Sequence, residues 1–316
     1  AYAIRGKANL WLKNWSAAET DFKKVQSLGY SLFPDYYNLF TEENEKNDEY
    51  ILQYQYYDDP GFGTGIARTY GNRNSTGYSW NNLIPNPVFV DSYQWANGKP
   101  FDIEEVIPGY TAKSPTERIA YYLRDDIYEK EKATVAEAGA DLSLYLGVGN
   151  EARVLSIYEG RDPRLAANFI TPYSSYLGGA TGTEYEYTMR WPFRYSDTGV
   201  VSEVTGEKFW DLRTDTQAKF YYMWRKFVFR GRQHTRQDNS PIDIPVIRYA
   251  EVLLGLAEAI NEQGRTTEAI PYINEVRDRA GVAGLNTNEY TQVTGQADLR
   301  QRIQDEYGWE FAGEGL

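Results

Sequence analysis

The 316-residue sequence contains no cysteine and a single histidine, His234. The absence of cysteine excludes disulfides, thiolate metal sites and cysteine nucleophiles. A hydrolytic triad would depend on His234, which lies in the polar run RGRQHTRQDNS, and the chain has no G-x-S-x-G motif. We therefore interpret His234 as a surface-loop residue, and we predict no catalytic residue and no metal ligand.

Basic residues are also scarce, because 33 basic side chains oppose 45 acidic ones and leave a net charge of −12. This balance argues against a nucleic-acid backbone or an anionic lipid surface as partner. No apolar run approaches the ~18 residues of a membrane-spanning helix, and no signal segment opens the chain. Aromatic residues, by contrast, are abundant: they make up 16% of the chain, with 28 tyrosines. A tyrosine has an apolar ring and a polar tip, which suits a wet binding surface.

Two stretches, 1–30 and 247–282, predict pairs of antiparallel helices. They share small and apolar residues at one constant offset along the chain: Gly6, Ala18, Phe22 and Val25 in the first, and Ala257, Ala269, Ile273 and Val276 in the second. Small residues let two helices approach closely while the larger ones fill the groove between them. The pattern resembles the tetratricopeptide repeat. Ser16 and Glu19 predict a capping box for the second helix, and Gly29 predicts its end.

The region 49–246 between these pairs is rich in loop-forming residues. Residues 49–59 predict a short strand, and 60–87 have the glycine, asparagine, serine and proline content of an irregular loop. Ser114 and Glu117 predict a helix start, with Ile119, Leu123 and Ile127 along one stripe. A further helix is expected over 142–159, short strands within 171–246, and a helical segment over 283–316.

Five phrases of the sequence together resemble the SusD/RagB family of outer-membrane nutrient-binding lipoproteins. They are VDSYQWANGKPFD (90–102), YEGRDPRLAANFI (158–170), PIDIPVIRYAEVLLGLAEAINEQG (241–264), AIPYINEVRDRAGV (269–282) and LRQRIQDEYGWEFAGEGL (299–316). The resemblance covers the family's C-terminal two-thirds and implies a single SusD-like domain fragment over 1–316, cut at both ends. The implied fold is mainly α: tetratricopeptide-like helix pairs form an α-superhelical scaffold that carries long irregular loops and a few short strands.

The resemblance also implies a function. Members of the family capture oligosaccharides without catalysis on the extracellular face of the outer membrane and deliver them to a SusC-like TonB-dependent transporter. They use no cofactor, and they are held by an N-terminal lipid anchor that this sequence does not contain. Three alternatives stay open: peptide capture on the same scaffold, an α-helical glycoside hydrolase, and an adaptor that binds only a protein.

Residues 56–82 hold the densest mixture of rings and planar polar groups, which is the combination that a sugar's apolar face and hydroxyl rim require. The candidate ligand contacts are Tyr57, Phe62, Tyr70, Arg73, Asn74, Tyr78, Trp80, Asn81 and the nearby Trp95. The family has no fixed binding motif, so these residues are chosen from composition alone. The competing interpretation is that the rings pin a long loop to the body of the protein. A second cluster comprises Tyr173, Tyr176, Tyr185, Tyr187 and Trp191.

Acidic residues gather at three places without forming a specific motif. The run 41–49 is expected to be a solvated loop, with calcium binding as the alternative. Adjacent acids at 102–105 and 125–126 are candidates for a glycosidase pair, but their separation in space decides such chemistry.

Overall fold

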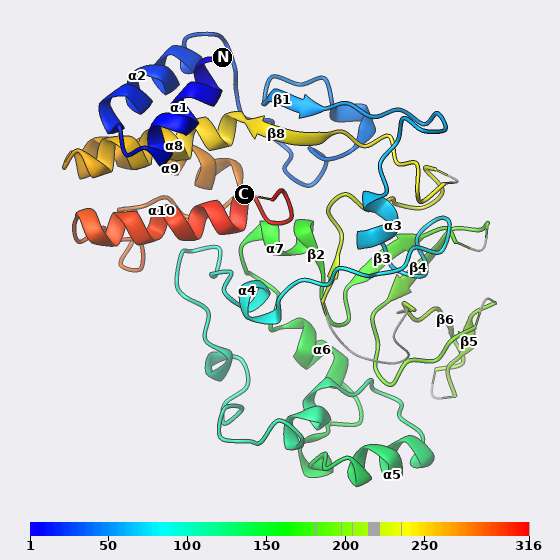
Figure 1. The fold of residues 1–316 in the computed structure, drawn as a ribbon. Helices are drawn as coiled ribbons and strands as arrows, with labels where there is room; N and C mark the ends of the chain where they lie inside the picture. The colour runs from blue at the N-terminus through cyan, green and yellow to red at the C-terminus, as the bar shows by residue number, and fades with distance from the viewer. Residues whose placement is uncertain (181, 197, 204, 214–221, 235, 316) are drawn as a thin grey trace.

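A computed structural model describes residues 1–180, 182–196, 198–203, 205–213, 222–234 and 236–315. Figure 1 shows helices α1, α2, α8, α9 and α10 packed side by side at one end of the molecule, which we call the helical frame. Short strand pairs, short helices and long loops extend from this frame. The fold is therefore mainly α with few short strands, as predicted.

The helices and strands have the following bounds. The α-helices are α1 (Tyr2–Trp11), α2 (Trp15–Gln26), α3 (Ile66–Tyr70), α4 (Pro87–Asp91), α5 (Glu129–Glu137), α6 (Asn150–Leu155), α7 (Pro163–Asn168), α8 (Tyr249–Glu262), α9 (Thr266–Arg279) and α10 (Gln296–Glu310). The 3-10 helices are η1 (Glu42–Asn44), η2 (Ile103–Glu105), η3 (Glu117–Tyr122) and η4 (Leu142–Leu144). The strands are β1 (Tyr50–Tyr54), β2 (Phe169–Ile170), β3 (Ser175–Gly178), β4 (Tyr185–Thr188), β5 (Val200–Val201), β6 (Lys208–Phe209), β7 (Met223–Trp224) and β8 (Ile244–Arg248).

The two predicted helix pairs are confirmed as α1–α2 and α8–α9, and α2 packs directly on α8. The ring of Phe22 is buried between two glycines, Gly6 on α1 and Gly255 on α8. A Cβ atom at either glycine would lie 2.7 Å from a carbon of the Phe22 ring. The small residues are therefore required where three helices meet around one aromatic side chain.

The capping box predicted for Ser16 and Glu19 is wrong. Helix α2 begins two residues earlier than predicted, with Asn14 at the N-cap, so Ser16 lies inside the first turn. The Glu19 carboxylate instead contacts Lys23 and reaches across to Gln263 and Arg265 beyond α8. Burial opposes ionisation, but these donors hold the pKa of Glu19 at about 2. An ion pair with Arg265, which is distant in the sequence, has replaced the predicted hydrogen bond between the Glu19 carboxylate and the Ser16 amide.

The strands form two-stranded antiparallel pairs, in which β1 joins β8, β2 joins β7, β3 joins β4 and β5 joins β6. The strand predicted over 49–59 is confirmed as β1. It pairs with the strand that leads into α8, with Tyr50 opposite Arg248. This pair connects the helical frame to the loop-rich part of the chain (Figure 1).

The helix predicted from Ser114 is shorter than expected. Ser114 and Glu117 do form the capping box: the Ser114 amide donates to the Glu117 carboxylate at 2.8 Å, and the Glu117 amide donates to the Ser114 hydroxyl at 3.3 Å. The element is η3, which ends where Leu123 becomes extended and the Arg124 amide donates to the Trp191 carbonyl.

The stripe of Ile119, Leu123 and Ile127 does pack together, in one hydrophobic cluster with Val135 of α5. Helix α5 itself was not predicted. The helix expected over 142–159 is two short helices, η4 and α6. They are separated at Gly149, which has a positive φ of 85°.

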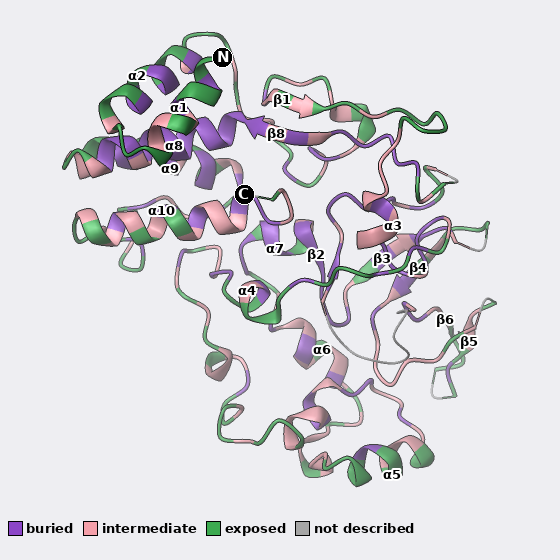
Figure 2. Cartoon of the chain, viewed as in Figure 1, coloured by how far each residue is buried: buried purple, intermediate pink, exposed green. Residues whose placement is uncertain are grey.

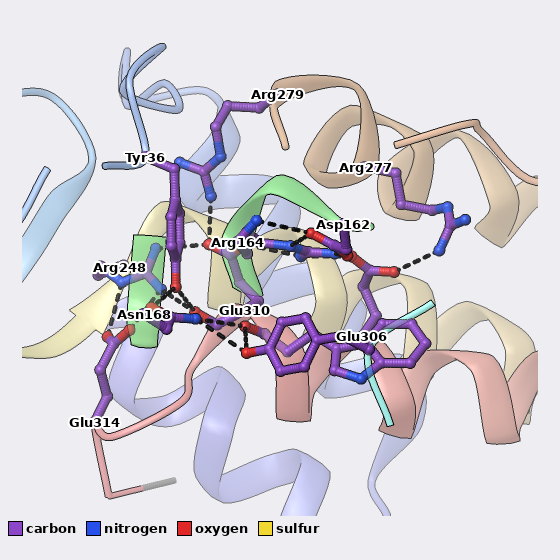
Figure 3. A network of polar contacts seen from close by, with 12 residues as sticks. Tyr36, Asp162, Arg164, Asn168, Arg248, Arg277, Arg279, Glu306, Glu310 and Glu314 are labelled. Atoms are coloured by element: carbon purple, nitrogen blue, oxygen red, sulfur yellow. Dashed lines mark hydrogen bonds and ion pairs between the residues drawn. The ribbon is translucent and has the colours of Figure 1, made fainter. Parts of the chain in front are cut away.

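Buried charges connect the helical frame to α7 (Figure 3). The Arg248 guanidinium contacts Glu49, lies 3.0 Å from the Glu310 carboxylate and lies 2.8 Å from the Glu314 carboxylate. The same Glu310 contacts Arg279 and lies 3.0 Å from Arg164. All six side chains are buried, and the three guanidiniums hold the pKa of Glu310 low although burial opposes its ionisation. The prediction that the run 41–49 is solvated is therefore wrong at Glu49.

The network continues along α10. Arg164 of α7 forms ion pairs with Asp162 and Glu306, both at 2.7 Å, and Arg277 of α9 pairs with Glu306 at 2.8 Å. Asn168 of α7 donates to the Tyr93 hydroxyl at 3.0 Å. Each of the five phrases that carry the family resemblance supplies at least one residue to this network. Those phrases therefore encode the assembly of the frame and its junction with α7. Within the frame, the buried residues are concentrated on α8 (Figure 2).

Candidate ligand-binding loops

The first loop, residues 56–63, is a tight turn that displays two rings. The Tyr57 amide donates to the Phe62 carbonyl at 3.1 Å, which closes the turn. The side chain of Tyr57 is 59% exposed and that of Phe62 is 67% exposed. The base of the loop is fixed by Asp243, whose carboxylate accepts from the Tyr56 amide at 2.7 Å. Both rings are therefore displayed from an anchored backbone.

The second loop, residues 71–82, is held from below by buried polar side chains. The side-chain carbonyl oxygen of Asn72 accepts hydrogen bonds from the backbone amides of Asn74 and Ser75. The Ser75 hydroxyl bonds to the Tyr176 hydroxyl at 2.8 Å. The Thr76 hydroxyl donates to the Gly231 carbonyl at 2.7 Å. The bonds of Ser75 and Thr76 hold the loop against segments more than a hundred residues away in the chain.

The second loop also displays two rings, on a strained backbone. Tyr78 is 41% exposed and Trp80 is 43% exposed. Tyr78 has a φ of 57° and Asn81 a φ of 52°, values in the left-handed region that side chains other than glycine seldom adopt. Such strain persists only where surrounding contacts fix the backbone, and it concentrates at functional sites.

The two loops flank the segment 237–239. The side-chain carbonyl of Asn239 accepts from the Gly63 amide of the first loop at 3.1 Å. Two residues earlier, Gln237 lies directly beside Gly77 of the second loop. The exposed rings of both loops therefore emerge from neighbouring parts of the molecular surface.

Three residues that composition did not suggest accompany these rings. The guanidinium of Arg68 lies 4.7 Å from the centre of the Trp80 ring. Arg213 lies 4.6 Å from the centre of the Tyr195 ring, and its backbone amide donates to the Asn74 side chain at 2.5 Å. Tyr195 is itself exposed. No local signal identifies Tyr195 and Arg213, because they come from distant segments that only the fold brings to the second loop.

The remaining predicted contacts occupy other positions. Arg73 is half-buried and donates to the Tyr78 carbonyl at 3.3 Å, whereas Asn74 and Asn81 are buried within the loop. Tyr70 stacks on Trp224 at 5.0 Å, and burial raises the pKa of its hydroxyl. Tyr70, Asn74 and Asn81 therefore lie beneath or within the loop, and the half-buried Arg73 lies beside Tyr78.

Trp95 is separate from both loops. Its ring packs 5.4 Å from Phe101, with the Arg161 guanidinium 5.8 Å away. The structure therefore brings Tyr57, Phe62, Tyr78 and Trp80 to one region of the surface and places Trp95 in another.

The second predicted cluster belongs mostly to the core. Tyr173, Tyr176 and Tyr187 are buried, and Tyr185 stacks on Trp210 at 4.4 Å. The Tyr173 hydroxyl donates to the Tyr122 carbonyl at 2.6 Å. For these rings the packing interpretation holds, because a buried ring cannot offer its face to a ligand.

His234 lies in a loop, as predicted, but its side chain is less exposed than a surface-loop residue was expected to be. Its side chain is only 13% exposed, and its ring lies 4.6 Å from that of Phe229. Its Nε2 atom lies 3.3 Å from the Glu42 carboxylate. A half-buried histidine between an aromatic ring and an acid serves here to hold the segment before β8 against η1.

The acids considered for glycosidase chemistry have structural partners. The Asp125 carboxylate accepts the backbone amides of Gly149 and Glu151, both at 2.9 Å, at the start of α6. Asp126 pairs with Arg124 at 3.0 Å, and Glu105 pairs with Lys99. Within the described ranges, no group of three or more histidines and carboxylates is placed to hold a metal ion. The helices described there are also too short or too polar to cross a bilayer.

Comparison with known proteins identifies the family. The model of the SusD family matches residues 36–316, which is most of the chain and confirms the resemblance drawn from the five phrases. A curated relative, SusD-like protein P25 from Formosa agariphila, is 32% identical over 107 residues, or 34% of this chain and 16% of that protein.

Solved structures share the fold. A SusD-like carbohydrate binding protein from Bacteroides fragilis has a TM-score of 0.65 at 23% identity, and the match covers 99% of this chain and 49% of that one. A SusD-like protein from the same species has a TM-score of 0.64 at 22% identity, covering 99% and 51%. A SusD-like carbohydrate binding protein from Bacteroides vulgatus has a TM-score of 0.53 at 17% identity, covering 99% and 42%. The chain thus spans about half the length of these relatives.

Proposed function

The chain belongs to the SusD family, and from this premise we propose that it captures oligosaccharides without catalysis, through the rings of its two exposed loops. The proposed contacts are Tyr57 and Phe62 of the first loop and Tyr78 and Trp80 of the second. Arg73 contributes polar contacts beside them. Tyr70, Asn74 and Asn81 act as positioning residues, and Trp95 contributes only if a ligand extends to its side of the molecule.

One observation supports this proposal above the others: exposed aromatic side chains are carried on loops whose backbones are fixed by buried polar groups. A ring that packs a loop onto the body of a protein is buried, as Tyr176 and Tyr187 are. Tyr57, Phe62, Tyr78 and Trp80 keep much of their surface in solvent instead. Fixed rings bind a sugar's apolar face at a low cost in conformational entropy.

The relatives support the same ligand class. Two of the solved structures with this fold are described as carbohydrate binding proteins. The acids considered for glycosidase chemistry are bonded to amides and basic side chains, which favours binding without hydrolysis. We extend the proposal to the family's setting: a lipid-anchored protein on the extracellular face of the outer membrane that passes its ligand to a SusC-like TonB-dependent transporter.

Replacement of Trp80 by alanine tests the proposal. The affinity of the wild-type protein and of Trp80→Ala is measured by calorimetry against a panel of neutral oligosaccharides. We expect Trp80→Ala to lose about tenfold or more in affinity, because loss of a stacked ring removes on the order of 1.4 kcal/mol or more. The matched control is Trp11→Ala, which removes a tryptophan that is 82% exposed on α1, outside the loops.

The alternatives predict different results in the same assays. Equal affinities of wild type and Trp80→Ala would move the site away from the second loop. Binding of short peptides but of no sugar would support peptide capture instead. Release of new reducing ends from a bound oligosaccharide would establish a hydrolase.

A further inference from the structure

A cleft of about 350 Å³ lies between α10 and the loop that follows α4. It shares no residue with the two ring-bearing loops. The cleft is lined by aromatic, amide, carboxylate and guanidinium groups, including Asp91, Gln94, Phe101, Tyr290, Asp305 and Trp309. The cleft is thus bounded by the frame and by part of the phrase 90–102, and the proposed function assigns it no role.

One wall of the cleft is a stripe along α10. Gln301, Asp305 and Trp309 follow at intervals of four residues, so they lie above one another on one helix face. The Asp305 carboxylate accepts from the Gln301 amide at 2.9 Å, its one partner among the described residues. The neighbouring Arg302 is occupied, because its guanidinium pairs with Asp298 at 3.1 Å. Asp305 therefore retains acceptor capacity toward the cleft.

The opposite wall is the turn over residues 95–99. The Trp95 amide donates to the Lys99 carbonyl at 2.9 Å, and Gly98 has a φ of 82°. A Cβ atom at Gly98 would collide with the side chain of Thr291 and lie 3.2 Å from the Arg277 guanidinium. The turn thus needs glycine at 98 in order to lie against the frame and close one side of the cleft.

Gln94 lies in the wall of this cleft with an unused donor. Its side chain is 95% buried, since only 5% of its surface is exposed. Its carbonyl oxygen faces the Arg277 guanidinium at 3.5 Å, and a guanidinium can only donate, so the NH2 group points elsewhere. That NH2 group has no hydrogen-bond partner in the described part of the chain. Burial of a donor without a partner is unfavourable, and a ligand oxygen that reached this NH2 group would remove that cost.

We propose that this cleft is a second binding site for a neutral, hydroxyl-rich ligand, namely a terminal sugar unit of an oligosaccharide. The inference takes its ligand class from the proposed function. A sugar hydroxyl can accept from the Gln94 amide and donate to Asp305, whereas an anion would be repelled by Asp91 and Asp305. Trp309 and Tyr290 also line the cleft and supply aromatic surface for the apolar face of the sugar. The Trp309 indole already donates to the Ser92 hydroxyl at 3.2 Å, which fixes its ring.

Site-resolved NMR of indole groups tests both sites at once. The protein is labelled with ¹⁵N-tryptophan, and the signals of Trp80 and Trp309 are assigned from the variants Trp80→Phe and Trp309→Phe. The probes are maltohexaose, cellohexaose, xylohexaose, laminarihexaose and neoagarohexaose. We expect at least one of them to shift the Trp309 signal in a saturable manner.

Two variants examine the polar contacts of the cleft. Gln94→Leu is expected to weaken the response of Trp309 by about fivefold to tenfold, as the loss of one hydrogen bond implies, and to leave the Trp80 response unchanged. Asp305→Ala should weaken the Trp309 response in the same way. Because Gln94→Leu also removes the carbonyl oxygen that faces the Arg277 guanidinium at 3.5 Å, we expect a small decrease in the thermal unfolding midpoint, and the Trp309 response decides the inference. A lowered midpoint, with no change in the Trp309 response, would make Gln94 structural and overturn the inference.

The outcomes separate this inference from the proposed function. A sugar that shifts Trp80 but never Trp309 overturns the second site and leaves the loops as the binding surface. A sugar that shifts Trp309 alone supports the cleft and refutes the loops. If no probe shifts either signal, both proposals fail. A shift of Trp309 by a cationic peptide, with no response to sugars, would also overturn the assigned ligand class.

Discussion

In the helical frame a network of charged side chains is buried and paired, whereas in the loops 56–63 and 71–82 four aromatic side chains are exposed. Arg248 and Glu310 are buried together between β8 and α10. Phe62 and Trp80 keep much of their surface in water. The frame has thus enclosed groups that normally favour solvent, and the loops expose groups that normally favour the core.

This contrast explains why the recognisable parts of the sequence say little about the ligand. The five family-like phrases converge on buried ion pairs, and a buried charge tolerates no loss of its partner. The loops have no comparable constraint on their outer surface, because an exposed ring contributes little to folding. Fold information is therefore concentrated in the frame, whereas the loops that we propose to bind the ligand carry no motif.

The strongest test of the contrast is the substitution Arg248→Met. It would leave the carboxylates of Glu49, Glu310 and Glu314 without their shared cation, and we expect a loss of about 3–5 kcal/mol in the free energy of unfolding. Chemical denaturation followed by circular dichroism measures this loss. Lys132→Met is the control, because both side chains of its pair with Glu129 are exposed, by 36% and 88%, and exposed pairs contribute about 0–1 kcal/mol. Equal losses in the two variants would contradict the assigned role of the network.

A second test addresses the packing of the frame. Gly255→Ala places a methyl group 2.7 Å from the Phe22 ring, and we expect a loss of about 1–3 kcal/mol from overpacking. Helix propensity alone would favour alanine inside α8, so a loss identifies the steric cause. Gly65→Ala is the matched control, since no atom lies within 4 Å of the position that its Cβ would occupy. Stabilisation of Gly255→Ala would show that α2 and α8 can move apart.

A third test removes a ring from the loops while sparing the backbone. Tyr78 has a positive φ, which glycine adopts freely, so Tyr78→Gly should leave the unfolding midpoint close to that of the wild type. Its affinity for a bound oligosaccharide should fall by about tenfold. Calorimetry and thermal unfolding on the same samples measure the two quantities. A large loss of stability with unchanged affinity would mean that the ring packs the loop and contacts no ligand.

The smallest expected effect concerns pH at the junction of frame and loops. Burial raises the pKa of Glu45 to about 7, although the Asp243 amide donates to its carboxylate. The folded protein therefore holds a proton that the unfolded chain releases, so this contribution to stability is complete below the ordinary pKa of glutamate and is lost as pH rises through about 7. Glu45→Gln should flatten the decrease in stability between pH 4.5 and 7.

Denaturation midpoints of wild type and Glu45→Gln, measured from pH 4.5 to 8, give the comparison. Glu43→Gln is the control, because Glu43 is an exposed neighbour in the same acidic run. Parallel curves for wild type and Glu45→Gln would rule out this carboxyl as the source of the pH dependence.

The sequence predicted the helix pairs well because their signal is local. In each pair, a small residue, Gly6 or Ala257, and the residues that pack near it all lie within one helix-turn-helix unit. The same reasoning failed at Ser16, where the Glu19 carboxylate found Arg265, a partner beyond α8. It also failed for α5 (Glu129–Glu137), whose polar sequence shows no strong apolar stripe.

For the candidate site, composition indicated the region 56–82 but could not decide which rings face solvent. Tyr70 and Tyr78 look alike in sequence, yet Tyr70 packs on Trp224 and Tyr78 is exposed. Tyr195 and Arg213 were missed, because they join the second loop from a different part of the chain. Whether a ring packs against another segment depends on residues that are distant in the sequence, so local composition cannot predict it.

The sequence by itself determined the balance of helices and loops, the repeat-like spacing of small residues and the absence of cysteine chemistry, since each of these depends on residue type and short-range periodicity. Only the tertiary structure decided that Glu49 and Arg248 neutralise each other in the core, and that Trp80 is exposed while Tyr176 is not. Whether a side chain is buried depends on every segment that packs around it, and these segments are far apart in the sequence.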